Sequence, residues 1–191
     1  MSLKLITAPT LIPITLAEAK LHCKIDVTDD DALITSLISA ATEAAEQVTG
    51  RALLPQTFEL TLDAFPDYFE LTRQPVTAIT SIIYRNTAGT LITLAGSDYT
   101  LDASNESGPA KVTPAYGTAW PDARADVASV KLRYVAGYTN AAAVPESIKS
   151  WIKLQISAMY ENRSAEFTGQ GFTSMKLGFV DALLDRHKVF A

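Results

Sequence analysis

The spacing of the apolar residues changes twice along this 191-residue chain. Between residues 33 and 48 apolar side chains recur at intervals of three and four, which is typical of one face of an amphipathic helix. Between residues 56 and 138 the chain is rich in Thr, Val, Ile, Phe and Tyr, and apolar residues alternate with polar ones, as in half-buried strands. From residue 145 the helical spacing returns. This order predicts an α+β fold: a small bundle of about four helices, with an antiparallel β region inserted between the second and third long helices.

The first two helices have clear start and stop signals. Thr15 followed by Glu18 is a capping box that opens a short helix running to about Cys23. Asp29–Asp31 places acidic groups at the positive end of a longer second helix, and Gly50 provides its left-handed stop. The second half of this helix is rich in alanine, which would allow another helix to approach closely.

Two further helices are expected after the β region. Pro145 suits the first turn of a helix, and the wide apolar coverage that follows indicates packing on two sides. A polar loop from Ser164 to Gly178 precedes a short last helix from Phe179 to about Lys188. The predicted organisation is therefore N-terminal helices over residues 1–55, the inserted β region over 56–138, and C-terminal helices completing the bundle over 139–191.

Composition and charge exclude several classes of protein. With 48% hydrophobic and 19% charged residues the chain is not mainly disordered, and no apolar run is long enough to cross a membrane. Its one cysteine excludes an internal disulfide. The net charge is −5, with the acidic surplus in residues 1–75, and no run of basic residues is present. Tight, phosphate-based binding of nucleic acid is not expected.

No group of residues predicts catalysis or a bound cofactor. His22 and Cys23 form the one close pair of soft metal ligands, and His187 is too far along the chain to complete a recognisable zinc or triad motif. Asp29–Asp31 is better explained by helix capping than by cation binding. Gly169–Gly171 lacks the lysine of a phosphate loop. We therefore expect no metal, no cofactor and no enzyme activity.

The order of several short segments is more specific than any one of them. These segments are Thr15-Leu16-Ala17-Glu18-Ala19-Lys20, Asp30-Asp31-Ala32-Leu33-Ile34, Ala44-Ala45-Glu46, Thr49-Gly50-Arg51-Ala52-Leu53, Gln56-Thr57, Gln74-Pro75-Val76, Gly117-Thr118-Ala119-Trp120-Pro121, Ala136-Gly137-Tyr138, Val144-Pro145, Tyr160-Glu161-Asn162-Arg163 and Leu183-Leu184. Over residues 14 to 190 this string resembles the tailed-phage head–tail connector (adaptor) family, in the longer form also described as a phage DNA-packaging protein. Two departures stand out: Arg186-His187-Lys188 replaces a terminal Tyr-Arg pair, and the shorter family members are mostly helical.

The resemblance implies a structural virion protein that forms a ring of identical subunits below the portal. Its partners would be itself, the portal protein and a tail or neck-completion protein, and DNA would pass through the channel without specific binding. Its place would be the virion neck, and the host bacterial cytoplasm during assembly. Two alternatives are another neck or tail-completion protein and a non-catalytic DNA-packaging accessory factor. An enzyme or DNA-binding factor is a third, which a basic patch or converging titratable groups would favour.

The C-terminal helix is the segment we expect to meet a partner. A helix this short must gain its stability by packing. Its narrow apolar face, extended by the chain end, predicts an oligomer or portal interface at Phe179, Leu183, Leu184 and Phe190. The alternative is that the helix seals its own bundle.

Overall fold

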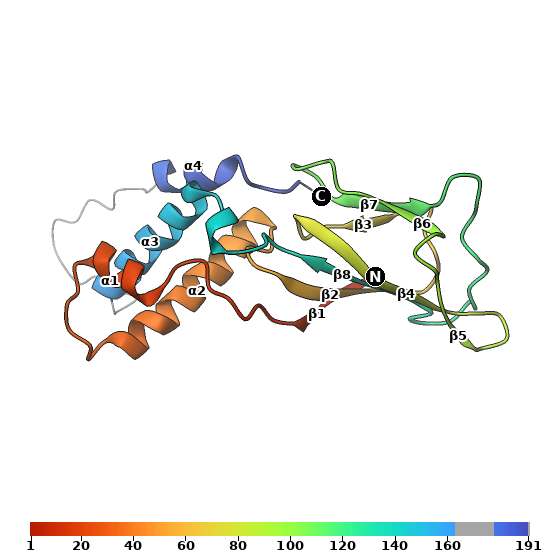
Figure 1. Ribbon diagram of the computed structural model, residues 1–191, viewed down its shortest axis with the longest axis horizontal. Coiled ribbons are helices and arrows are strands. Elements are labelled where there is room, and N and C mark those ends of the chain that lie inside the picture. The colour runs from red at the N-terminus through yellow and green to blue at the C-terminus, as the bar shows by residue number, and fades with distance from the viewer. Residues whose placement is uncertain (163–177, 191) are drawn as a thin grey trace. The chain divides into compact units, whose positions relative to one another are not determined.

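The computed structural model describes residues 1–162 and 178–190, with only the backbone of Gly178 and Phe179. The helices are α1 (Leu16–Cys23), α2 (Asp31–Thr49), α3 (Glu146–Glu161) and α4 (Gly178–Asp185), with a 3-10 turn at Ala141–Ala143. The strands are β1 (Ser2–Thr7), β2 (Gln56–Leu62), β3 (Phe69–Leu71), β4 (Val76–Arg85), β5 (Leu91–Thr93), β6 (Tyr99–Asp102), β7 (Ala110–Pro114) and β8 (Val130–Ala136). These elements confirm the predicted α+β fold: along the chain, β2 to β8 lie between α2 and α3, whereas β1 precedes α1 (Figure 1).

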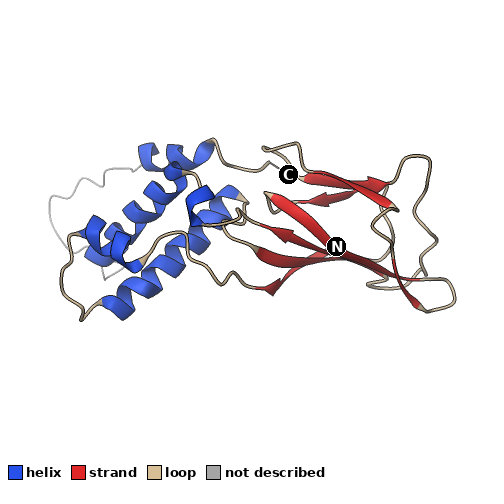
Figure 2. Ribbon diagram, in the orientation of Figure 1, coloured by secondary structure: helices blue, strands red, loops and turns tan. Residues whose placement is uncertain are grey.

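The chain divides into two compact units. The helical unit comprises residues 11–49 and 140–188, and the sheet unit comprises residues 1–10, 50–139 and 189–191. All eight strands belong to the sheet unit and all four α-helices to the helical unit (Figure 2). None of the helices in the described part of the chain is both long and apolar enough to span a membrane.

The helical unit is built on the predicted apolar stripes. α3 contacts α1, α2 and α4, which explains why it is apolar on two sides. Its buried residues meet those of α2 and α4, and the core side chains are Ile34, Ile38, Ala41, Ala45, Ile148, Trp151, Ile152, Ile156, Val180 and Leu184. Ala41 and Ala45 are fully buried, so half of the alanine-rich face of α2 packs within its own unit.

The helix ends follow the local signals in the sequence. The Thr15 hydroxyl accepts from the Glu18 backbone N–H at 3.2 Å, and the Thr15 backbone N–H donates to the Glu18 carboxylate at 2.7 Å. Gly50 follows α2 with a φ of +69°, a conformation that a residue without Cβ adopts at low cost. The acidic start of α2 also binds its neighbours: Tyr160 donates to Asp30 at 2.5 Å, and Lys20 pairs with Asp31 at 2.6 Å.

The sheet unit contains two antiparallel sheets. The five-stranded sheet has the order β1-β2-β8-β4-β5, and the three-stranded sheet has the order β3-β7-β6. The β4–β5 hairpin turns at residues 86–89. β1 was not predicted. It pairs with β2 in antiparallel register, so that the first residues of the chain form one edge of the larger sheet.

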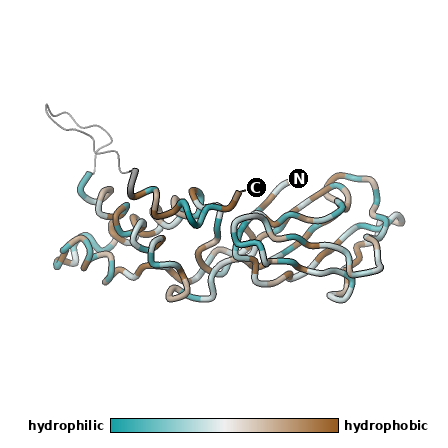
Figure 3. The backbone as a smooth tube through the Cα atoms, turned by 90° about the horizontal axis from the view of Figure 1, so that it is seen from above, coloured by the Kyte–Doolittle hydropathy of each residue, from teal (hydrophilic) through white to brown (hydrophobic). Residues whose placement is uncertain are grey.

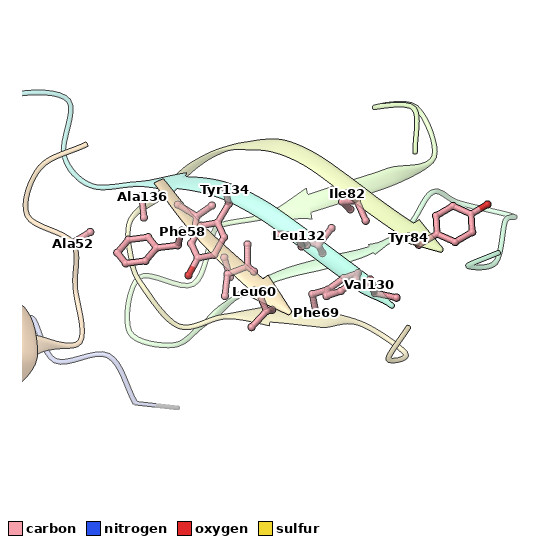
Figure 4. Close-up of a cluster of buried hydrophobic side chains, with 14 residues drawn as sticks. Ala52, Phe58, Leu60, Phe69, Ile82, Tyr84, Val130, Leu132, Tyr134 and Ala136 are labelled. Carbon is pink, nitrogen blue, oxygen red and sulfur yellow. The ribbon is translucent and has the colours of Figure 1, made fainter. Parts of the chain in front are cut away.

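A continuous hydrophobic core fills the sheet unit (Figure 4). Alternate residues of β2 and β8 point into it, and Phe58 stacks on Tyr134 with ring centroids 5.6 Å apart. Burial of the Tyr134 hydroxyl raises its pKa to about 12. Figure 3 shows that hydrophobic and hydrophilic residues are interspersed along the backbone of both units. The buried members of the core are Ala52, Phe58, Leu60, Phe69, Leu71, Val76, Ile82, Tyr84, Ala110, Val112, Val130, Leu132, Tyr134 and Ala136.

Candidate assembly surfaces

The titratable residues singled out in the sequence do not come together in a catalytic arrangement. His22 is exposed on α1. Cys23 beside it is partly buried, and burial raises the pKa of its thiol. The His187 ring nitrogen Nε2 lies 2.8 Å from the Ser147 hydroxyl. Within the described residues, no three His, Cys, Asp or Glu side chains are grouped so that they could hold a metal ion.

Helix α4 packs on α3 within the helical unit. Leu184 is 0% exposed, whereas Leu183 is partly buried. The Trp151 indole N–H donates to the Asp181 carboxylate at 3.3 Å, which adds a polar contact between the two helices. The side chain of Phe179 lies outside the described residues, as does the segment 163–177 that contains the glycine-rich run. Leu184 could reach a partner only if α4 left α3.

The chain end lies on the sheet unit. The Phe190 backbone N–H donates to the Ser107 carbonyl at 2.9 Å, which holds the main chain, whereas the Phe190 ring is 70% exposed. The ring borders a hollow of about 420 Å³, lined by Glu70, Asn105, Ser107, Gly108, Pro109, Lys111 and Phe190. Phe190 is therefore a side chain of the predicted interface that is available to a partner without rearrangement.

Two buried polar residues hold the loop beneath this chain end. Arg51, only 7% exposed, donates from Nη2 to the Glu106 carbonyl. Gln74, 2% exposed, donates to the Gly108 carbonyl at 3.1 Å. Both residues lie in segments that carry the family resemblance. Their spatial meeting could not be read from the sequence, because 22 positions separate them and each is an ordinary polar residue in its own segment.

Other residues in these segments also have structural roles. Gly137 has a φ of +124°, and a Cβ there would lie 2.1 Å from the Leu54 carbonyl oxygen. Trp120 stacks on Phe65 at a centroid distance of 5.2 Å, so it contributes to the aromatic packing of the sheet unit. The short motifs thus mark turns, close backbone approaches and aromatic packing.

Basic residues from separate strands gather on one face of the larger sheet. Lys4, Glu59 and Arg133 are aligned across β1, β2 and β8. Arg133 pairs with Glu59 at 2.6 Å, and Lys131 approaches the same carboxylate at 4.0 Å. This cluster does not form a basic run in the sequence, because its members come from distant segments. Glu59 offsets part of its charge.

The largest set of exposed apolar residues in one strand lies on β1. Leu3 is 40% exposed, Leu5 45% and Ile6 39%. This strand was not predicted, although the alternation of Ser2, Leu3, Lys4 and Leu5 is a period-two signal. The strand was not recognised because it is short and precedes the first helix.

Comparison with known proteins identifies the family. The sequence profile described as "Phage gp6-like head-tail connector protein" matches residues 13–111. No curated protein matches the chain. A solved structure of the virion of a native gene transfer agent particle contains a chain with 25% identity and a TM-score of 0.79, covering 100% of this chain and 97% of that one.

Two further solved structures share the fold. They are the neck of an empty gene transfer agent particle computed with C6 symmetry (24% identity, TM-score 0.78) and the neck of a native particle computed with C12 symmetry (24%, 0.75). Each matches 100% of this chain and 97% of its own. The profile match and the full-length structural match agree with the expectation from the sequence motifs. The chain belongs to the phage gp6-like head–tail connector family and is a structural neck protein.

Proposed function

We propose that this protein forms a closed ring in the neck of a tailed phage or phage-like particle, and that DNA passes through the ring to the tail. The observation that carries the proposal is the match over the whole chain to a protein of a gene transfer agent virion, with both units included. The sixfold and twelvefold symmetry of the matched necks supports a ring of identical subunits. The assembled protein would reside in the virion neck, and the free subunit in the host bacterial cytoplasm.

The ring would bind the portal on one side and a tail or neck-completion protein on the other. The C-terminal residues remain our proposed contact. Phe190 and the partly buried Leu183 offer apolar surface as they stand, whereas Leu184 would join them only if α4 left α3. Phe179 is proposed as part of the same contact from the sequence alone. The Phe190 main chain is fixed by its hydrogen bond to Ser107, and an aromatic side chain has only two rotatable bonds. The ring therefore loses little conformational entropy when it enters a pocket on a partner.

The channel would let DNA slide without holding it. The chain carries a net charge of −5, and the basic cluster on the larger sheet is partly neutralised by Glu59. We expect duplex DNA at about 150 mM salt to bind no more tightly than the 10⁻⁴–10⁻⁶ M typical of non-specific contacts. Submicromolar affinity in a shift assay would contradict this and favour a DNA-packaging accessory factor.

A non-catalytic role is part of the proposal. The family and the matched virion proteins are structural, and several titratable residues of the described chain serve in ion pairs and a helix cap, among them Lys20, Asp31 and Glu18. The second candidate is another neck or tail-completion protein, which the same fold would fit.

Capture by the portal separates these candidates. The purified protein is mixed with portal rings alone, and then with a tail-completion protein alone, and complexes are separated by size. A head–tail connector joins the portal directly, and Phe190→Ala weakens this binding while Tyr116→Ala, a control at an exposed aromatic, does not. Binding to the tail-completion protein but never to the portal would contradict the connector assignment.

A further inference from the structure

Strand β1 differs from every other strand of the larger sheet. All six residues from Ser2 to Thr7 are exposed, whereas each of the other four strands has at least one residue that is buried or partly buried. Three of the six are large aliphatic residues. β1 is also an edge, paired on one side with β2 and open on the other. An apolar strand with a free edge is a site at which another chain readily adds.

The exposed leucines lie on the side of the sheet that faces the core. Leu3 is directly opposite Leu60, and Leu5 is directly opposite Phe58. Residues opposite one another in an antiparallel pair project to the same face. Leu60 and Phe58 are 3% and 7% exposed, yet no β1 residue belongs to the core cluster of the described chain. The core therefore ends at β2, and the β1 leucines remain exposed beside it.

The usual protection of edge strands is weak on this side. Lys4 is the one charged residue of the strand, and it is opposite Glu59, so it lies on the other face of the sheet. A register shift between Leu5 and Thr7 leaves Ile6 as a bulge at the end of the strand. Ser2 to Leu5 thus remain a regular edge with two adjacent exposed leucines on one face.

We infer that β1 is a subunit contact, and that a second copy of this chain covers Leu3 and Leu5 and lies along the open edge. The inference rests on the proposed ring. A closed ring needs a heterologous contact, in which one surface of each copy meets a different surface of the next. The two edges of this sheet, β1 and β5, are different strands and so satisfy that requirement. The family profile begins at residue 13 and does not include β1, whereas the match to the symmetric necks includes it.

The test uses the full chain with both leucines changed, Leu3→Lys together with Leu5→Lys. Lysine is tolerated on edge strands, so the fold is retained while the contact is charged. The control is Leu21→Lys, at a leucine 81% exposed on α1. Light scattering over a concentration series measures ring formation, and thermal unfolding checks the fold. We expect the double variant to melt within a few degrees of wild type but to need at least about tenfold more protein to form rings, and the control to match wild type.

Rings of the folded double variant at wild-type concentration would overturn the inference and leave the ring proposal intact. Normal rings that no longer join the portal would also overturn it, because another protein would then be the occupant of β1. Failure of the wild-type protein to form rings, alone or on the portal, would refute the proposed function and this inference with it.

If the double variant unfolds, hydrogen exchange on the wild-type protein provides the decision. We expect amides of residues 2–7 to exchange about tenfold more slowly in the ring than in the monomer. Equal exchange in the two states would overturn the inference.

Discussion

The two units of this protein differ in how completely they bury their own apolar surface. In the helical unit Ile34, Ile148, Ile152 and Leu184 are all 0% exposed, and the exposed large apolar residues lie in loops or at single helix positions: Leu11, Ile12, Leu21, Val27 and Val48. In the sheet unit the centre is equally well buried, but the core ends one strand before the sheet does. The described core of the helical unit is closed within one subunit. We propose that the sheet unit is completed by a neighbouring subunit.

The largest effect is expected in the core of the helical unit. Leu184→Ala should lower the free energy of unfolding by about 2–5 kcal/mol, because a fully buried leucine leaves a cavity. Leu183→Ala, at a partly buried neighbour on the same helix, should cost clearly less. Urea denaturation of both variants measures the difference. Equal, small losses would mean that α4 does not seal the unit and would favour its role as a detachable docking helix.

The sheet unit should respond strongly at its tightest backbone approach. Gly137→Ala should cost about 2–4 kcal/mol, since the new Cβ meets the Leu54 carbonyl and the positive φ is strained for alanine. Gly96→Ala is the matched control, because a Cβ there meets nothing within 4 Å. Thermal unfolding of the two variants is compared, and similar melting temperatures would contradict the described geometry.

A smaller loss of stability is expected at a site that is held by hydrogen bonds rather than by apolar packing. Arg51→Met should lower the free energy of unfolding by about 1–3 kcal/mol, because the largely buried Arg51 side chain loses its hydrogen bond to the Glu106 carbonyl. Arg85→Met changes an exposed arginine of the same unit and should be close to neutral. Denaturant titration of this pair tests whether the loop under Phe190 is held by Arg51, and unchanged stability of Arg51→Met would show that it is not.

The smallest effect is expected at the start of α1. Thr15→Ala removes the capping box and should cost about 1 kcal/mol. The Thr15 backbone N–H and hydroxyl lower the pKa of Glu18, so the ionised form is favoured in the folded state. This contribution is present above the unfolded pKa and is lost as pH falls through the folded pKa. The stability gap between wild type and variant should therefore narrow on acidification, and a gap that widens would contradict the capping role.

The features that the sequence predicted correctly depend on residues that are close together in the chain. Helix starts and stops at Thr15, Gly50 and Pro145 depend on neighbours a few residues away, so they were predicted correctly. The strands with long alternating patterns were found for the same reason. The meeting of Arg51 with Gln74 depends on chain folding across distant segments, and no local pattern encodes it.

The candidate surfaces divide in the same way. Phe190 was expected from the apolar end of the chain, and it lies exposed. The exposure of Leu3 and Leu5 was not expected, because it depends on tertiary packing: the core of the sheet unit includes residues of β2 but none of the edge strand β1. The basic cluster around Glu59 requires the register of β2 against β8.

The central claim is that this chain assembles into a closed ring through its incomplete sheet unit. Negative-stain images of the purified protein, at high concentration and on its portal, test this most directly. We predict closed rings with a mass that is a multiple of the 20.6 kDa subunit and a symmetry like the sixfold or twelvefold symmetry of the matched necks. A tight twofold dimer that forms equally well with and without portal, and never closes into a ring, would contradict the account.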